Sequence, residues 1–159
     1  MSENKNPSTS NVALKEWAVT IDALDRGMQV ILLRKGGIHE EGRAFNLLHQ
    51  KFLLFPTFDH QGAELLKSGI RSQLYADVDN PYPDKDVLFS HWAEVIDTIT
   101  VADQSKLDRI SPYHIWADNY AEKRLNWKPR HPLYLFVIRV YRLEEPQSLA
   151  YSQEYAGCR

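Results

Sequence analysis

The chain has 159 residues, of which 43% are hydrophobic and 25% are charged, and its formal net charge is −2. A chain of this size typically folds as one domain and buries roughly two-thirds of its unfolded surface, so it needs no cross-links. The single cysteine, Cys158, excludes an intramolecular disulfide, and the small net charge excludes a surface that attracts nucleic acid everywhere.

The start of the chain is not expected to be a targeting segment. The first twelve residues are polar, and the longest apolar run, residues 133–138, is too short to cross a bilayer. We therefore expect a cytoplasmic protein without a membrane partner. Residues 1–11 are expected to form a disordered tail, residues 12–146 a single α+β domain, and residues 147–159 a C-terminal tail.

The first half of the chain predicts a helix and two strands. Apolar residues recur at helical spacing from Leu14 to Leu24, with Gly27 as a left-handed stop, which predicts a helix over residues 14–26. Residues 29–34 are β-branched and leucine-rich, which is typical of a strand buried on both faces. Residues 52–56 predict a strand that Pro56 ends, and a short helix through Lys67 is expected to stop at Gly69.

The second half predicts a loop, two strands and another helix. Two prolines and three aspartates within residues 75–85 indicate a surface loop. Residues 87–101 alternate in part, as expected of a long strand with a bulge or bend, and this length favours a barrel over a flat sheet. Ser111 before Pro112 predicts a helix over residues 112–125. Residues 133–143 form the strongest strand pattern in the chain.

The clearest charge feature extends from Lys123 to Arg142, where no acidic residue occurs and aromatic residues alternate with cations. Cations neutralise phosphates and aromatic rings stack on bases, so this composition is typical of a nucleic-acid surface. The alternative is that the rings are core and the cations only complement a helix dipole. Arg34 and Lys35, before two glycines, form a second candidate anion site or simply a solvated turn. The candidate ligand-binding residues are Arg34, Lys35, Trp127, Lys128, Arg130 and Arg139.

No complete catalytic signature is present. The sequence lacks a glycine-rich phosphate loop, the glutamate cluster of a Nudix hydrolase and the Glu-x-Lys of a restriction-type nuclease. An alternative is a metal-assisted hydrolase or nuclease with ligands His49, His60 and Glu41 or Asp59. Cys158 has no fixed base to activate it. We expect no cofactor and no catalysis. A further alternative is a scaffold that docks a partner protein through exposed Tyr75, Tyr82 and Trp92.

Four ordered segments, ALKEWAV, LLRKGGI, FLLFPTFDHQ and WKPRHPLYLFVIRVYRLEEP, resemble an uncharacterised bacterial family, number 1802 among the domains of unknown function. The resemblance covers residues 13–146. It implies a link to restriction-modification or DNA defence and brings no catalytic residues.

A weaker resemblance concerns the fold. Gly27 and Arg34 match the G-x-K-x-x-E-x-R signature of ASCH domains, whereas Gln29 and Leu32 replace its Lys and Glu. ASCH domains are PUA-like small β-barrels that bind RNA or nucleotide-like ligands. We therefore expect an α+β fold with a small, partly closed, mixed or antiparallel β-barrel and flanking helices. The expected function is a non-catalytic module that binds nucleic acid or a nucleotide.

Overall fold

The computed structural model describes residues 12–35, 51–57, 63–70, 86–127 and 133–152. These ranges contain strands β1 (Ala13–Trp17), β2 (Ile31–Lys35), β3 (Lys51–Thr57), β4 (Val87–Val101) and β5 (Leu133–Leu149). The helices are α1 (Ala18–Asp25), α3 (Gln104–Ile110) and α4 (Asp118–Asn126), with 3-10 turns η1 (Ala63–Leu65) and η3 (Ser111–Tyr113). The expected tail over residues 1–11 and the expected loop over residues 75–85 lie outside the described residues.

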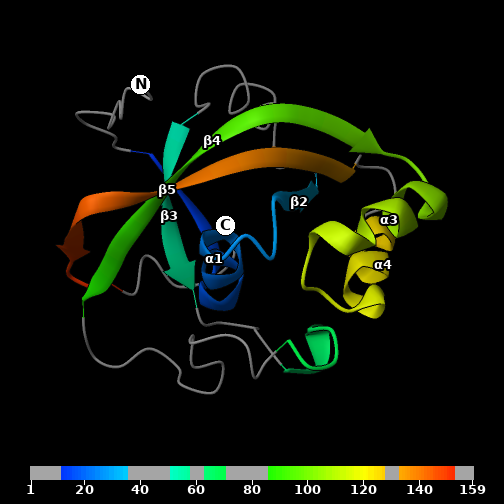
Figure 1. The fold of residues 1–159 in the computed structure, drawn as a ribbon, viewed down its shortest axis with the longest axis horizontal. Coiled ribbons are helices and arrows are strands. Elements are labelled where there is room, and N and C mark those ends of the chain that lie inside the picture. The colour runs from blue at the N-terminus through cyan, green and yellow to red at the C-terminus, as the bar shows by residue number, and fades with distance from the viewer. Residues whose placement is uncertain (1–11, 36–50, 58–62, 71–85, 128–132, 153–159) are drawn as a thin grey trace.

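The five strands form one mixed sheet in the order β1-β3-β4-β5-β2 (Figure 1). β1 pairs with β3 in parallel, and the other neighbours are antiparallel. The predicted α+β class and mixed sheet are confirmed. The sheet is not closed into a barrel, because β1 and β2 are its two edges and no backbone ladder joins these two strands.

The predicted helix over residues 14–26 is wrong in its first turn. Ala13–Trp17 is a strand that aligns Leu14 with Leu54, and only Ala18–Asp25 is helical. The apolar residues would be buried in a helix or in a strand, so their helical spacing does not decide between the two. Pairing with β3 favours the strand. Gly27 does take the predicted left-handed conformation, with a φ of +71°.

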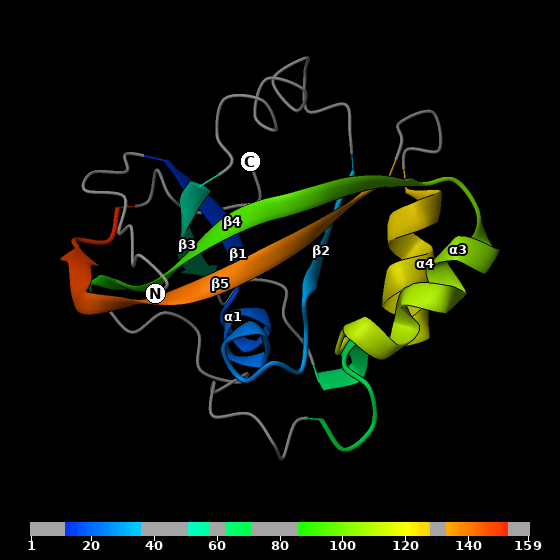
Figure 2. The same cartoon turned by 45° about the horizontal axis from the view of Figure 1, so that its top comes forward.

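β4 and β5 form a long, curved ribbon that runs across the molecule (Figure 2). The predicted bulge in residues 87–101 is confirmed by register shifts at Phe89/His91 and Val95/Asp97. β5 continues to Leu149, beyond the predicted end at residue 143. Pro146 is tolerated there because the pairing jumps from Phe89↔Gln147 to His91↔Arg142, which leaves the proline out of the ladder.

The predicted helix over residues 112–125 is divided in two. Ser111–Tyr113 is a 3-10 turn, Trp116 forms a bridge with Leu66, and α4 begins only at Asp118. α3 was not predicted; it begins after Asp103, whose side chain accepts a hydrogen bond from the Lys106 backbone. The expected helix before Gly69 is reduced, in the residues described there, to the turn η1.

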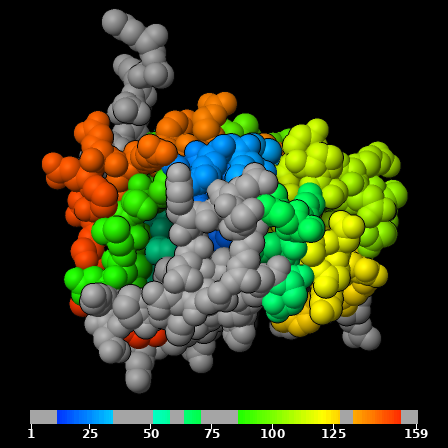
Figure 3. Space-filling model, turned by 60° about the horizontal axis from the view of Figure 1, so that its bottom comes forward, coloured from blue at the N-terminus to red at the C-terminus, as the bar shows by residue number. Residues whose placement is uncertain are grey.

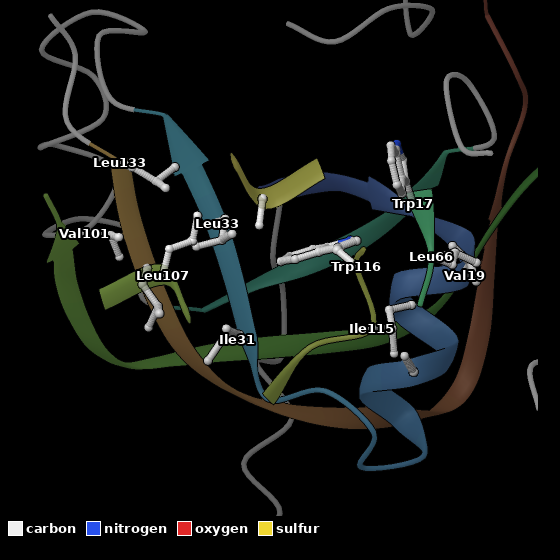
Figure 4. Packing of buried hydrophobic residues seen from close by; sticks show 13 residues of the cluster. Trp17, Val19, Ile31, Leu33, Leu66, Val101, Leu107, Ile115, Trp116 and Leu133 are labelled. Atoms are coloured by element: carbon white, nitrogen blue, oxygen red, sulfur yellow. The ribbon is translucent and has the colours of Figure 1, made fainter. Parts of the chain in front are cut away.

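Helices cover part of both faces of the sheet. Leu107 of α3 and Ala121 of α4 pack with Leu33 of β2 and with Trp116 in one cluster (Figure 4). In a second cluster, Ile21 and Leu24 of α1 pack against Leu32, Phe52, Leu54, Ala93, Phe136 and Ile138. β2 is therefore buried on both faces, as predicted. Among the described helices, none is long and apolar enough to cross a membrane.

Candidate ligand-binding site

Several predicted ligand-binding residues gather at one end of the sheet. Arg34 and Lys35 end β2, and Lys35 pairs with Leu133, the first residue of β5. Trp127 directly follows α4 and is half-exposed, and residues 128–132 connect it to Leu133. Figure 2 shows the end of α4 beside the start of β5. On the face in Figure 3, the light blue atoms of the β2 region lie between the orange atoms of β5 and the yellow-green atoms of the helical region. Lys128 and Arg130 lie outside the described residues.

Arg139 is separated from this group. Arg34 pairs with Tyr134, and Arg139 lies five positions further along β5, opposite Glu94. At about 3.3 Å per residue this is roughly 16 Å. Arg142 is engaged elsewhere, because its guanidinium donates two hydrogen bonds to Asp25, of 2.6 and 2.8 Å. The basic stretch therefore does not form one continuous patch over the described residues.

An ion pair joins the two unpaired edges of the sheet. We call this region the β1–β2 seam. It consists of Lys15, Glu16 and Trp17 of β1, Arg34 of β2, and Trp116 and Tyr120, which pack beside them. Nη2 of Arg34 donates to the Lys15 carbonyl at 2.6 Å and to Oε2 of Glu16 at 2.7 Å. The Glu16 side chain is 7% exposed and that of Arg34 is 23% exposed. The carboxylate thus balances the charge of Arg34 within the protein.

Aromatic rings surround the same pair. The Tyr120 ring lies 5.0 Å from that of Trp17 and 5.3 Å from that of Trp116. Nε of Arg124 donates to the Tyr120 hydroxyl at 3.0 Å, and its guanidinium lies over the ring. Burial raises the pKa of the Tyr120 phenol, so its hydroxyl remains protonated at neutral pH.

Two buried donors at the seam have no hydrogen-bond partner within the described part of the chain. They are Nε of Arg34 and the indole Nε1 of Trp116. In Figure 4 the Trp116 ring lies between Leu33 of β2 and Trp17 of β1. A buried donor left unsatisfied destabilises a fold by about 1–3 kcal/mol, so two at one place require a physical explanation. Thr20 Oγ1 and Trp92 Nε1 are in the same state elsewhere in the described core.

The segment that carries Trp116 is fixed by polar contacts that are buried or partly buried. Lys67 donates to the carbonyls of Ser111 and His114. Nδ1 of His114 accepts a hydrogen bond from the Trp116 backbone at 3.2 Å. Burial, with a smaller contribution from the Lys67 charge, lowers the pKa of His114 to about 4. His114 is therefore neutral at physiological pH, which this hydrogen bond requires.

The two positions that depart from the ASCH signature have structural roles. Gln29 is 1% exposed, and its amide donates to the Ile31 carbonyl at 2.8 Å and accepts from the Ile115 backbone at 3.1 Å. Leu32 is fully buried in the core. No polar pocket is built from these two side chains, so Arg34 is the signature position whose polar side chain reaches the seam.

The described residues give little support to the other predicted sites. The proposed metal ligands His49, His60, Glu41 and Asp59, and also Cys158, lie outside them. The part of the chain that the structure describes holds no group of three or more His, Cys, Asp or Glu side chains suited to a metal ion. Trp92 was expected to be an exposed docking residue, but it is 4% exposed and stacks on Tyr141 at 4.2 Å. That expectation is wrong for Trp92; Tyr75 and Tyr82 lie outside the described ranges.

Sequence reasoning found Arg34 but missed Glu16, Trp116 and Tyr120. Glu16 stood in a segment interpreted as an amphipathic helix, where a charge has an ordinary place on the solvent side. Trp116 and Tyr120 were assigned to one continuous helix. Leu14 and Glu16 would share one face of a strand, so the segment lacks the apolar-polar alternation that indicates a strand, and only tertiary packing brings these residues to Arg34.

Comparison with known proteins gives a family and a fold. The family model described as Domain of unknown function (DUF1802) matches residues 13–159. No curated protein matches the chain. Among solved structures, a crystal structure of a point mutant of ZmASCH from Zymomonas mobilis aligns with a TM-score of 0.50 and 10% identity. The alignment covers 86% of this chain and 71% of that one. This likeness concerns the fold alone, and it confirms the predicted fold-level similarity to ASCH domains.

Proposed function

The chain belongs to the DUF1802 family, whose function is unknown, and we propose that it is a non-catalytic module that binds nucleic acid or a nucleotide. The proposed site is the end of the sheet where β2, the end of α4 and the start of β5 meet. Lys35, Lys128 and Arg130 contact phosphates there, and Trp127 offers a stacking surface. Arg139 lies further along β5, so it would contact only a ligand that is longer than one nucleotide.

The observation that carries this proposal is the position of α4 relative to β2. The last turn of α4 contains Lys123 and Arg124, and it leads to the half-exposed Trp127. The β2 residues Arg34 and Lys35 lie at the same end of the sheet, because Lys35 pairs with Leu133 and only residues 128–132 separate Leu133 from Trp127. Cations and an accessible ring that converge from two segments favour a ligand with phosphates and a base.

The ion pair with Glu16 changes the role of Arg34. A guanidinium that already has a carboxylate partner attracts a phosphate weakly, since the net charge of the pair is zero. We therefore assign phosphate contact to the other cations and place Arg34 beside an uncharged part of the ligand.

The test is the salt dependence of binding. Single-stranded RNA, single-stranded DNA, duplex DNA and mononucleotides are titrated at salt concentrations from about 50 to about 200 mM, with fluorescence anisotropy or calorimetry as the readout. Duplex DNA is included because of the implied link to DNA defence. Lys128→Ala with Arg130→Ala is expected to weaken binding and to reduce the slope of log K against log salt by about 1.4 for single strands, or about 0.7 for each phosphate that is no longer neutralised.

The control removes the same charge from α3. Lys106→Ala with Arg109→Ala changes two exposed cations outside the proposed site, so the salt slope should stay at the wild-type value. Trp127→Ala should cost about 1–3 kcal/mol of affinity if one base stacks on the ring. An affinity that does not vary with salt, or no binding to any of these ligands, contradicts the proposal.

A further inference from the structure

We propose that the β1–β2 seam binds a neutral, planar group with hydrogen-bond acceptors, of the kind that the edge of a nucleobase presents. Nε of Arg34 and the indole N–H of Trp116 are its donors. The choice of a nucleobase rests on the function proposed above, whereas the neutral and acceptor character follows from the seam itself.

The first argument is the pair of unsatisfied donors. Both atoms are buried, and neither has an acceptor within the described residues. The Trp116 ring contacts that of Tyr120, and Arg34 bonds to Glu16, which precedes Trp17, whose ring also contacts Tyr120. Two donors without partners beside one tyrosine match a ligand with two acceptors, because each bond formed removes a penalty of about 1–3 kcal/mol that the free protein carries.

The second argument is electrostatic. Arg34 donates through Nη2 to Glu16 and to the Lys15 carbonyl, which leaves Nε as a donor on a guanidinium whose charge is balanced. A phosphate at this position would face the Glu16 carboxylate, itself 7% exposed, and would be repelled. A carbonyl oxygen or ring nitrogen accepts the same hydrogen bond without that repulsion.

The third argument is the aromatic environment and its cover. The guanidinium of Arg124 lies over the Tyr120 ring, 5.3 Å from its centroid, on a face of the ring where a planar base can also stack. Arg124 lies in the last turn of α4 and is only half-buried, so its side chain can turn to solvent without disturbing the core. Replacement of Arg124 by the ligand gives access to the Tyr120 ring, which contacts the ring of Trp116.

A competing explanation is that the protein simply tolerates unsatisfied indoles, and Trp92 provides the comparison. Its Nε1 is also buried and without a partner in the described chain, but it lies beside Tyr141 and Lys51 and away from Arg34. Trp92 therefore serves as a matched control: the same residue type, equally buried and equally unsatisfied, outside the seam.

The experiment uses adenosine, guanosine, cytidine and uridine as probes, with inorganic phosphate as the charged comparison, in the full chain. We expect at least one nucleoside to bind with an affinity that changes little with salt, and phosphate not to compete with it. Trp116→Phe keeps a large ring but removes the donor, so it should weaken that binding about tenfold, while Trp92→Phe should leave it unchanged. Equal effects of the two substitutions, or none from Trp116→Phe, overturn the seam as the site.

A second measurement needs no substitution at the seam. The indole ¹⁵N–H resonances of the wild-type protein are recorded during titration with the nucleoside. Trp92→Phe and Trp127→Phe identify two of the four tryptophan signals, and nuclear Overhauser contacts with the neighbouring His114 ring separate Trp116 from Trp17. The Trp116 resonance should move downfield as it gains an acceptor, and that of Trp92 should not move. A stationary Trp116 signal in the presence of bound nucleoside rejects the inference even if Trp116→Phe fails to fold.

The two proposals fail differently. If oligonucleotides bind with a steep salt dependence but no nucleoside binds, the seam inference is wrong and the nucleic-acid function stands. If neither oligonucleotides nor nucleosides bind, both are wrong.

Discussion

His114 shows how one buried side chain makes the fold sensitive to pH. It is 3% exposed and neutral, and its Nδ1 accepts the backbone hydrogen bond of Trp116. The pKa is about 4 in the folded protein against 6.5 for an ordinary histidine. Between these two values the unfolded chain binds a proton that the folded chain does not, so the free energy of unfolding decreases as the pH falls from about 6.5 to about 4.

The corresponding prediction concerns His114→Asn, which keeps an acceptor near the position of Nδ1 but does not titrate. The wild type should lose up to about 3 kcal/mol of stability over this pH range that the variant does not lose. Urea unfolding followed by circular dichroism from pH 7 to pH 4 measures both proteins. Carboxylates that titrate in the same pH range affect the stability of both proteins equally. If the stability of the two proteins falls in parallel with pH, His114 binds its proton in the folded protein as well as in the unfolded chain.

At the scale of single elements, Asp25 anchors the end of α1 to the β4–β5 ribbon. Arg142 of β5 donates to both of its carboxylate oxygens, and Nε2 of His91 in β4 lies 2.9 Å from Oδ1. The guanidinium bonded to Asp25 holds the pKa of that carboxyl well below its usual range. A carboxylate at a helix C-terminus is unfavourable by itself, so these partners explain why it is tolerated.

We expect Asp25→Asn to lower the melting temperature by a few degrees at pH 7 and by less as the pH falls below about 4. The carboxylate contributes stability above its unfolded pKa, and this contribution decreases once the unfolded chain is protonated. Asp22→Asn is the control, since Asp22 belongs to the same helix and forms its ion pair with Arg26 one turn away. Similar losses from the two substitutions would mean that the link between α1 and the ribbon adds nothing.

Elements were predictable where the local signal and the tertiary outcome agreed. The β-branched run at residues 29–34, the alternation at 87–101 and the apolar run from residue 133 all form strands in regions that the pattern indicated. β1 was missed because Leu14 and Trp17 fit a helical face equally well, and its partner β3 is remote in the sequence. Likewise, the break before α4 depends on Trp116 bridging to Leu66, which no local pattern reveals.

The candidate site was predictable only in part for the same reason. Cations next to glycines and a basic stretch with tryptophan are visible in one segment at a time, and they identified Arg34 and Trp127. The Glu16 partner of Arg34 and the rings of Trp116 and Tyr120 come from three other positions that meet only in the folded chain. The neutralised state of Arg34, on which the ligand chemistry depends, therefore had no sequence signal.

At the scale of the whole molecule, the sheet has two open edges that side chains join. A barrel would have paired β1 with β2 through the backbone, whereas here Arg34 crosses from one edge to the other. Side chains can separate and close again more readily than a backbone ladder, because they break fewer hydrogen bonds. An open sheet bridged in this way is suited to admit a flat ligand at the bridge.

The far end of the β4–β5 ribbon includes residues beyond the expected domain end. Residues 147–149 of β5 pair with residues 87–89 of β4, and Ser148 donates to Asp86 at 3.1 Å. Tyr151 packs against a cluster of Phe55, Val87 and Phe89. The expected domain end at residue 146 would remove this pairing and this cover.

A chain that ends after residue 146 should therefore be less stable than one that ends after residue 152, by about 2–3 kcal/mol. Loss of pairing and cover exposes part of Phe89 and Val87, and full burial of such a side chain is worth about 1.5–3 kcal/mol. Both chains lack residues 153–159, so the difference in their urea midpoints, at equal slopes, isolates residues 147–152. Equal midpoints would support a tail that begins at residue 147, and a lower slope for the shorter chain would show that the end of the ribbon has already unfolded in its native state.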